Sequence, residues 1–220
     1  MKSTLAQVTF ELSAVVALSN HGPKLGQTDM HDSVMLHLRF DPERLRQDLD
    51  RLNECNWIDH FVEQNYEGSW SVIPLRGPAD AAHPIQMIYS DPSCTEFSNT
   101  PFLDDCPYFR EVLSKFECPL TAVRLMKLAS GSKIKEHADY DLSIEDGTAR
   151  LHIPITTNDK IRFLINGRCV VMNEGECWYL RLSDPHSVIN GGTTDRVHLV
   201  IDSIVNDWLL QQISKGHVTA

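Results

Sequence analysis

The stretch that decides the fold is ARLHIPITTNDKIRFLINGRCVVMNEGECWYLRL, residues 149–182. Short β-rich runs alternate in it with turn residues, and Asn166-Gly167 is the strongest hairpin signal because both residues tolerate a positive φ. Glu174-Gly175 and Asn190-Gly191-Gly192 mark further turns. With the flanking segments, we expect strands over Val123–Leu128, Ala149–Ile155, Ile161–Ile165, Arg168–Met172, Cys177–Leu182 and Arg196–Ile204. So many short strands predict a β-sandwich or barrel of the jelly-roll type.

The N-terminal half mixes strand and helix. Apolar residues at 34, 36, 38 and 40 alternate with polar ones, which predicts a half-buried strand. Asp41-Pro42 then supplies an N-cap and a first-turn proline for a helix whose leucines at 45, 49 and 52 share one face. Short strands joined by turns are expected over Asn65–Asp91, and a short helix over Cys106–Phe116. The fold class is therefore mainly β with buttressing helices.

The length of 220 residues suits one domain. We divide it into an N-terminal extension (1–30), a support region of helix and strand (31–119) and a jelly-roll core that carries the site (120–206). Hydrophobic residues make up 42% of the chain, enough for a substantial core.

The formal charge of −10 disfavours double-stranded nucleic acid and anionic membrane surfaces as partners. No run is as long as a membrane span, and Glu11 interrupts the apolar N-terminal stretch, which argues against a signal peptide. We therefore expect a cytoplasmic protein with no membrane partner. The six cysteines form no CxxC pair and are expected to be reduced thiols, neither disulfides nor zinc ligands.

One cluster has the composition of a metal site. In His137-Ala138-Asp139, residues i and i+2 of a strand would point to the same face and converge on one ion. His186, in Asp184-Pro185-His186, is the candidate third ligand. Two imidazoles and one carboxylate on one side of a metal leave three positions open, as in non-haem Fe(II) oxygenases.

A second cluster is cationic. Arg196 lies ten residues beyond His186, and its guanidinium can grip a carboxylate through two parallel hydrogen bonds. Arg150 and His152 form another i, i+2 pair. Together these residues offer positive groups for both ends of a dicarboxylate bound beside a metal.

Each feature also has a plainer interpretation. His137 and Asp139 alone could be a surface pair, and His186 a turn residue. Arg150, Arg196 and His198 could be solvated residues on strand faces, as such side chains usually are. The ordered set of His-x-Asp, a later histidine and an arginine ten residues on favours the metal site.

The chain resembles the bacterial aspartyl/asparaginyl β-hydroxylase family, which includes free-proline hydroxylases. The resemblance runs from about Asn65 to Trp208 and rests on NYEGSWSVIPLRG (65–77), FLDDCPYFREVLSKF (102–116), VRLMKLASGSKIKEHAD (123–139), RLHIPITTN (150–158) and GECWYLRLSDPHSVINGGTTDRVHLVID (175–202). It implies a double-stranded β-helix fold, a ferrous ion, and 2-oxoglutarate and O₂ as co-substrates.

The resemblance also implies roles for single residues. His137 and His186 match the metal-binding histidines, and Asp139 matches a carboxylate that some members lack, so that its presence favours a full facial triad. Arg196 matches the arginine that binds the distal carboxylate of 2-oxoglutarate. Arg150 and His152 match a pair that approaches the other carboxylate of the co-substrate. Each metal-binding histidine should have a hydrogen-bond partner that fixes its tautomer, which the sequence does not identify.

The first functional hypothesis is hydroxylation of a C–H bond in a free amino acid or a small derivative. Within the same class, the alternative is hydroxylation of an Asp or Asn side chain in a peptide or protein. Other classes are a non-catalytic, cupin-like binding module and a zinc hydrolase with Glu136 or Asp141 as base. Arg196 argues against the module, because a sensor has no need of a 2-oxoglutarate clamp.

Overall fold

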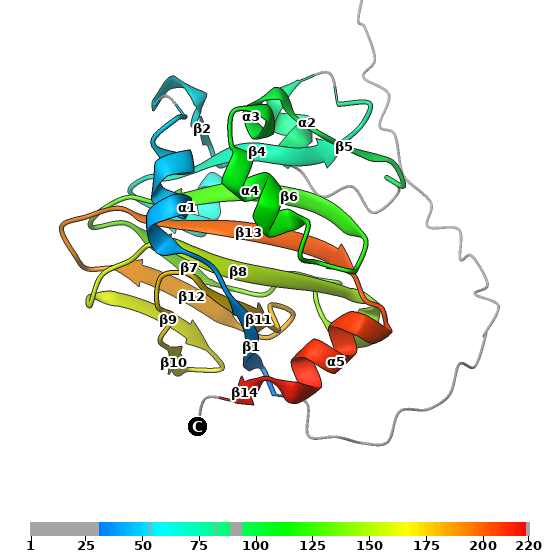
Figure 1. The fold of residues 1–220 in the computed structure, drawn as a ribbon. Coiled ribbons are helices and arrows are strands. Elements are labelled where there is room, and N and C mark those ends of the chain that lie inside the picture. Colours follow the sequence, from blue (N-terminus) through cyan, green and yellow to red (C-terminus); the bar gives the residue numbers. More distant parts are fainter. Residues whose placement is uncertain (1–30, 53, 82, 89–93, 219–220) are drawn as a thin grey trace, which may run out of the picture. The chain divides into compact units, whose positions relative to one another are not determined.

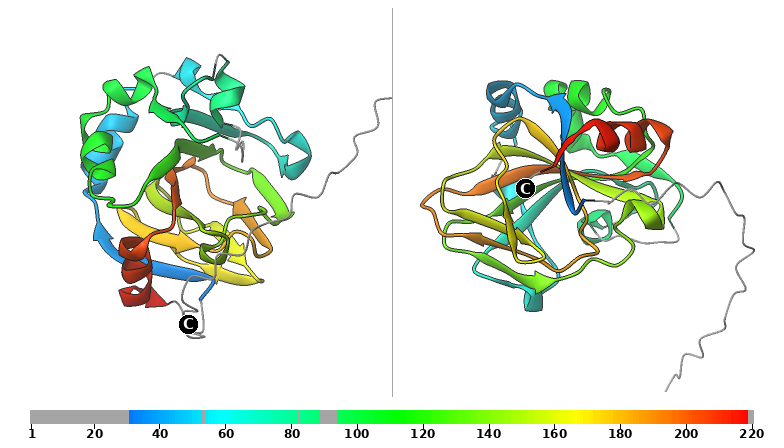
Figure 2. Two further views of the ribbon diagram at one scale, coloured as in Figure 1. Left: turned by 90° about the vertical axis from the view of Figure 1, so that its right-hand side faces the viewer. Right: turned by 90° about the horizontal axis from the view of Figure 1, so that it is seen from below.

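The structure is a computed structural model and describes residues 31–52, 54–81, 83–88 and 94–218. In this part of the chain two antiparallel sheets face each other (Figures 1 and 2). The large sheet runs in the order β14 (His217–Val218), β1 (Ser33–Arg39), β11 (Glu176–Leu180), β8 (Thr148–Thr156), β13 (Arg196–Ile204), β6 (Leu120–Leu128), β4 (Trp70–Pro78) and β2 (Ile58–Asp59), with β5 (Phe97–Asn99) paired to β4. The small sheet runs in the order β10 (Arg168–Val170), β9 (Ile161–Ile165), β12 (His186–Asn190), β7 (Lys133–His137) and β3 (Tyr66–Glu67).

Helices pack against the large sheet. They are α1 (Pro42–Leu49), α2 (Pro84–Ile88), α3 (Pro101–Asp104), α4 (Pro107–Leu113) and α5 (Asp207–Lys215), with 3₁₀ turns at Glu54–Asn56, Glu63–Asn65 and Ile144–Asp146. Figure 1 shows α1 and α4 in front of the large sheet. No helix in the described ranges is long and apolar enough to cross a membrane; the cytoplasmic location stays a prediction.

The large sheet is buried on both faces, and each face has its own core. On the outer face Leu36, Leu45, Phe109, Leu199 and Leu209 belong to one cluster, which joins the sheet to the helices. On the inner face Trp70 and Val200 of the large sheet pack with Phe163, Ile165 and Val188 of the small sheet. Because it lies between the two cores, β13 is buried at every residue except its last, its polar residues included.

Several expectations are confirmed. Asn166 and Gly167 both have positive φ, 51° and 73°, and join β9 to β10 in the expected hairpin. Asp41 caps α1 by accepting hydrogen bonds from the backbone N–H groups of Glu43 and Arg44. The mainly β class with buttressing helices is confirmed. Residues 1–30, the expected extension, lie outside the described residues, and the division into support and core stays a prediction.

Other expectations need correction. The alternation of apolar and polar residues did not single out β7 and β12, because charged residues surround the one buried apolar residue of β7 and Pro185 precedes β12. The region Asn65–Asp91 contains α2 as well as strands, and the predicted helix Cys106–Phe116 ends at Leu113. The described cysteines at 94, 106, 118, 169 and 177 need no such correction, because they are free thiols as expected.

Candidate metal centre

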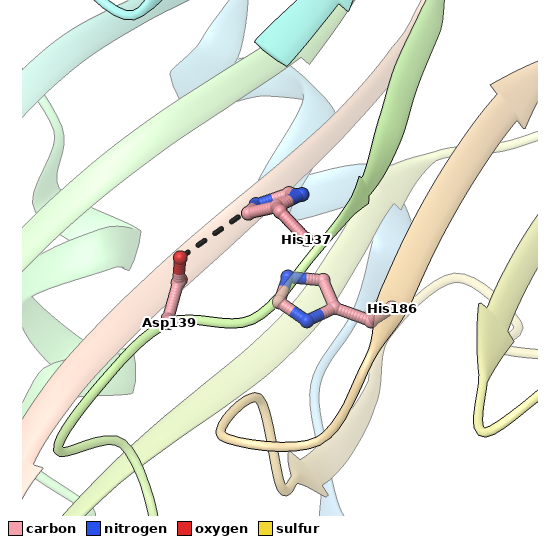
Figure 3. Close-up of side chains that lie close together, drawn as sticks. All are labelled: His137, Asp139 and His186. Atoms are coloured by element: carbon pink, nitrogen blue, oxygen red, sulfur yellow. Dashed lines mark ion pairs between the residues drawn. The ribbon is translucent and has the colours of Figure 1, made fainter.

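The pairing of two strands of the small sheet brings the metal-ligand candidates together. β7 and β12 are antiparallel with His137 directly opposite His186, and the two ring centroids are 4.3 Å apart. β7 ends at His137, so Asp139 lies in the following loop, where its N–H donates to the carbonyl of Leu182 at 2.8 Å. One ligand atom from each of the three residues lies within 4.8 Å of the others (Figure 3). The expected convergence is present, but the loop produces it and not a shared strand face.

Both imidazoles have the tautomer that a metal requires. His137 Nδ1 lies 2.7 Å from the carbonyl of Lys135, and His186 Nδ1 lies 3.0 Å from the carbonyl of Asp184. A carbonyl oxygen only accepts, so each Nδ1 carries a proton, and in the neutral ring the lone pair is then on Nε2. Burial lowers the pKa of His186, although the hydrogen bond to Asp184 opposes this, and the neutral form is the ligating one.

The carboxylate of Asp139 contacts His137 through one oxygen and Arg150 through the other. Its Oδ1 lies 3.6 Å from His137 Nε2, while its Oδ2 accepts from Arg150 Nη1 at 2.7 Å. Asp202 in turn accepts from Arg150 Nε at 2.6 Å and Nη2 at 3.0 Å, and from Arg124 Nη1 at 3.0 Å. Burial would raise the pKa of Asp202, but the two guanidinium groups outweigh it and lower the pKa to about 2. Asp202 is therefore an anion at any working pH.

All six residues proposed for the site line one cavity, which has about 380 Å³ of empty volume including its opening to solvent. They are His137, Asp139, Arg150, His152, His186 and Arg196, and the remaining wall is formed by Trp70, Met126, Ile134, Phe163, Leu182 and Val188. The site is thus a small apolar cavity with a few polar groups that converge, the usual form of a small-molecule site.

Arg196 is a buried cation without a counter-ion. Only 2% of it is exposed, and no carboxylate of the described residues lies within 4.0 Å of its guanidinium. Nη2 donates to His198 Nδ1 at 2.9 Å, and Nε has no partner among the described residues. Burial lowers the pKa of Arg196 to about 9. A buried guanidinium left in this state is suited to an anionic ligand that enters the cavity.

His152 adds an unpaired polar atom to the same cavity. Its Nδ1 lies 3.4 Å from His198 Nδ1, and its buried Nε2 has no partner within the described ranges. Burial first, and then the charge of Arg196, lowers the pKa of both histidines, so both are neutral. The alternative in which Arg150, Arg196 and His198 are solvated is wrong, because all three are buried.

Sequence reasoning missed Asp202 and Arg124. The signal was present, since Arg196, His198, Val200 and Asp202 follow the period of two that puts them on one face of β13. Asp202 also lies directly opposite Arg150 across the β13–β8 pair. That register depends on strand pairing, which a single sequence does not specify.

Most of the chain matches a known protein family. The family model described as "Aspartyl/Asparaginyl beta-hydroxylase" matches residues 40–205. The chain belongs to this family. The match to this hydroxylase family contains every residue of the candidate site and all strands of the small sheet.

Two known proteins are similar to this chain, one in sequence and one in fold. The chain is 27% identical over 168 residues to an L-proline cis-4-hydroxylase of Rhizobium meliloti (strain 1021), which covers 75% of this chain and 58% of the relative. The chain thus spans little more than half the length of that curated relative. A solved oxidoreductase of the 2OG-Fe(II) oxygenase family from Burkholderia pseudomallei is 16% identical, with a TM-score of 0.52 over 80% of this chain and 86% of the other. This likeness supports the jelly-roll fold.

Proposed function

We propose that this protein is an Fe(II)- and 2-oxoglutarate-dependent dioxygenase that hydroxylates a C–H bond of a free amino acid or a small amino-acid derivative. O₂ would be consumed, and succinate and CO₂ would be the co-products. One observation carries the proposal: His137, Asp139 and His186 converge in the same cavity as Arg196, which is buried and has no carboxylate of the described residues within ion-pair distance.

The donor set fits ferrous iron. Two imidazoles whose Nδ1–H groups donate to backbone carbonyls, which leaves Nε2 for a metal, and one carboxylate match the 2-His-1-carboxylate set of non-haem Fe(II) oxygenases. Iron bound there, together with 2-oxoglutarate, would supply the activation of O₂. The side chains of this chain would bind, orient and exclude water.

Arg196 would hold the distal carboxylate of 2-oxoglutarate, since it is the buried cation of the cavity that lacks an anion among the described residues. Arg150 and His152 are proposed for the other carboxylate. Three of the five N–H donors of Arg150 are committed to Asp139 and Asp202, which leaves two. The apolar wall would keep bulk water from the reacting groups.

The proline hydroxylase relative supports a free amino acid as substrate. The description of the family supports the second candidate, an Asp or Asn side chain in a peptide or protein. Turnover with free amino acids and with short peptides separates the two, because an enzyme that requires the free carboxylate of an amino acid should not act on the same residue within a peptide.

The test is succinate release by anaerobically iron-loaded protein given 2-oxoglutarate, ascorbate, air and a pool of L-amino acids. We expect succinate that depends on iron and rises with one member of the pool, and none from His186→Ala. If neither amino acids nor peptides raise succinate above that background, Fe(II) and 2-oxoglutarate are titrated under argon. Absence of the metal-to-ligand charge-transfer band would refute the proposed dioxygenase.

A further inference from the structure

We infer that Asp202 is a positioning residue for the metal site: it fixes Arg150, which in turn directs Asp139 at the metal. The inference rests on the proposed function, because it assigns a role toward the same metal site. The observation that carries it is the chain of ion pairs that runs from Asp139 through Arg150 to Asp202.

Asp202 fixes the plane of the Arg150 guanidinium. Its two carboxylate oxygens accept from Nε at 2.6 Å and from Nη2 at 3.0 Å, a two-point contact that a single hydrogen bond does not provide. The β13–β8 register places the two residues opposite each other, and both are buried, at 7% and 9% exposure. Arg150 therefore has little freedom to change its rotamer.

The fixed guanidinium then determines which oxygen of Asp139 faces the histidines. Nη1 is the group of Arg150 that points away from Asp202, and it donates to Asp139 Oδ2 at 2.7 Å. Oδ1 remains, and it is the oxygen that lies toward His137 in Figure 3. Asp139 needs such support because it lies in a loop, where no strand pairing holds its side chain.

Arg124 completes the charge balance. It donates to Asp202 Oδ2 at 3.0 Å, so two buried guanidinium groups face the two carboxylates of Asp202 and Asp139. Without Asp202, the Arg150 guanidinium would lose its two-point contact, and Nη1 would no longer be held toward Asp139 Oδ2. A purely structural role for Asp202, as counter-ion of buried arginines, makes a different prediction for metal binding.

A double-mutant cycle on metal affinity separates the two roles. Co(II), which accepts the same nitrogen and oxygen ligands, is titrated into the metal-free protein and followed by its visible absorption. Asp202→Asn is expected to weaken Co(II) binding by about 10–100-fold when Asp139 is present, the usual cost of losing an outer partner of a ligand. In an Asp139→Ala background the same change should cause no further loss.

Equal losses in both backgrounds, or no loss in the first, would overturn the inference. Because Asp202→Asn leaves buried cations and could prevent folding, Arg150→Lys serves as the second variant. It keeps a charge near Asp202, but an ammonium cannot reproduce the two-point contact, so it should weaken Co(II) binding tenfold or more only when Asp139 is present.

Asp48→Asn is the matched control, since Asp48 is also a buried carboxylate, 2% exposed, that accepts from Phe109 N–H and pairs with Arg51 away from the cavity. It should lower stability and leave Co(II) affinity unchanged. Failure of the unchanged protein to bind Co(II) would refute the metal site itself. Binding without the predicted coupling would refute only the role of Asp202.

Discussion

Arg196→Met should stabilise the metal-free protein while it removes the response to 2-oxoglutarate. The guanidinium is buried beside neutral His198 with no counter-ion in the described structure, and burial lowers its pKa from the usual arginine value to about 9. At 1.36 kcal/mol per pKa unit, the charged group is destabilised by about 5 kcal/mol relative to its neutral form. Methionine fills a similar volume without that cost.

The net gain in the free energy of unfolding will be smaller than about 5 kcal/mol. The substitution removes the hydrogen bond to His198 Nδ1, which leaves a buried acceptor without its donor and costs about 1–3 kcal/mol. We therefore expect the free energy of unfolding to rise by about 2 kcal/mol. For a chain of this size the Tm would rise by about 4–8 °C.

The assay is urea unfolding of EDTA-treated protein in HEPES, because phosphate or citrate could occupy the site. In the unchanged protein, Mn(II) with 2-oxoglutarate at 100 times its Kd should add about 2.7 kcal/mol, and the variant should not respond to the co-substrate. Arg76→Met is the control: Arg76 donates to Leu120, Phe97 and Asn99, so its removal should destabilise the protein. If Arg196→Met is less stable than the unchanged protein, the claim that the buried Arg196 cation lowers the stability of the ligand-free protein is wrong.

Three further outcomes are expected. The stability difference between Arg196→Met and the unchanged protein should shrink as pH rises through about 9, because above this pH the folded protein loses a proton that the unfolded chain, with the usual higher arginine pKa, still keeps. Urea titrations from pH 7 to 10 measure this difference, and a constant difference would contradict the low pKa of Arg196. His186→Ala should bind Fe(II) at least tenfold more weakly by anaerobic titration and lose turnover while keeping its far-UV spectrum; wild-type affinity would exclude it as a ligand. Gly175→Ala should lower the free energy of unfolding by roughly 3 kcal/mol, since Gly175 has φ +76° and an added Cβ would clash with the carbonyl oxygen of Phe40. Thermal unfolding tests this, and an unchanged Tm would show that the turn relaxes.

Much of the site could be predicted from the sequence because residue type and order carry the chemistry. Histidine and aspartate, the residue types at 137, 139 and 186, are ligands that ferrous iron accepts. Arg196 follows His186 by ten residues in the chain. All of them line the cavity. Their assignment as ligands of the metal and of 2-oxoglutarate stays a prediction until binding is measured.

The sequence by itself determined the local features of this protein: the β-rich runs, the Asn166-Gly167 hairpin, the Asp41 cap and the types of residue available for a metal site. These depend on backbone preferences and on neighbours a few residues away, which a single chain displays directly. The tertiary structure alone decided that His137 lies opposite His186, that Asp202 lies opposite Arg150, and that Arg196 is buried without an anion in the described part of the chain. Register and burial depend on which strands pair across long sequence separations, and that choice follows from the packing of the two sheets as a whole.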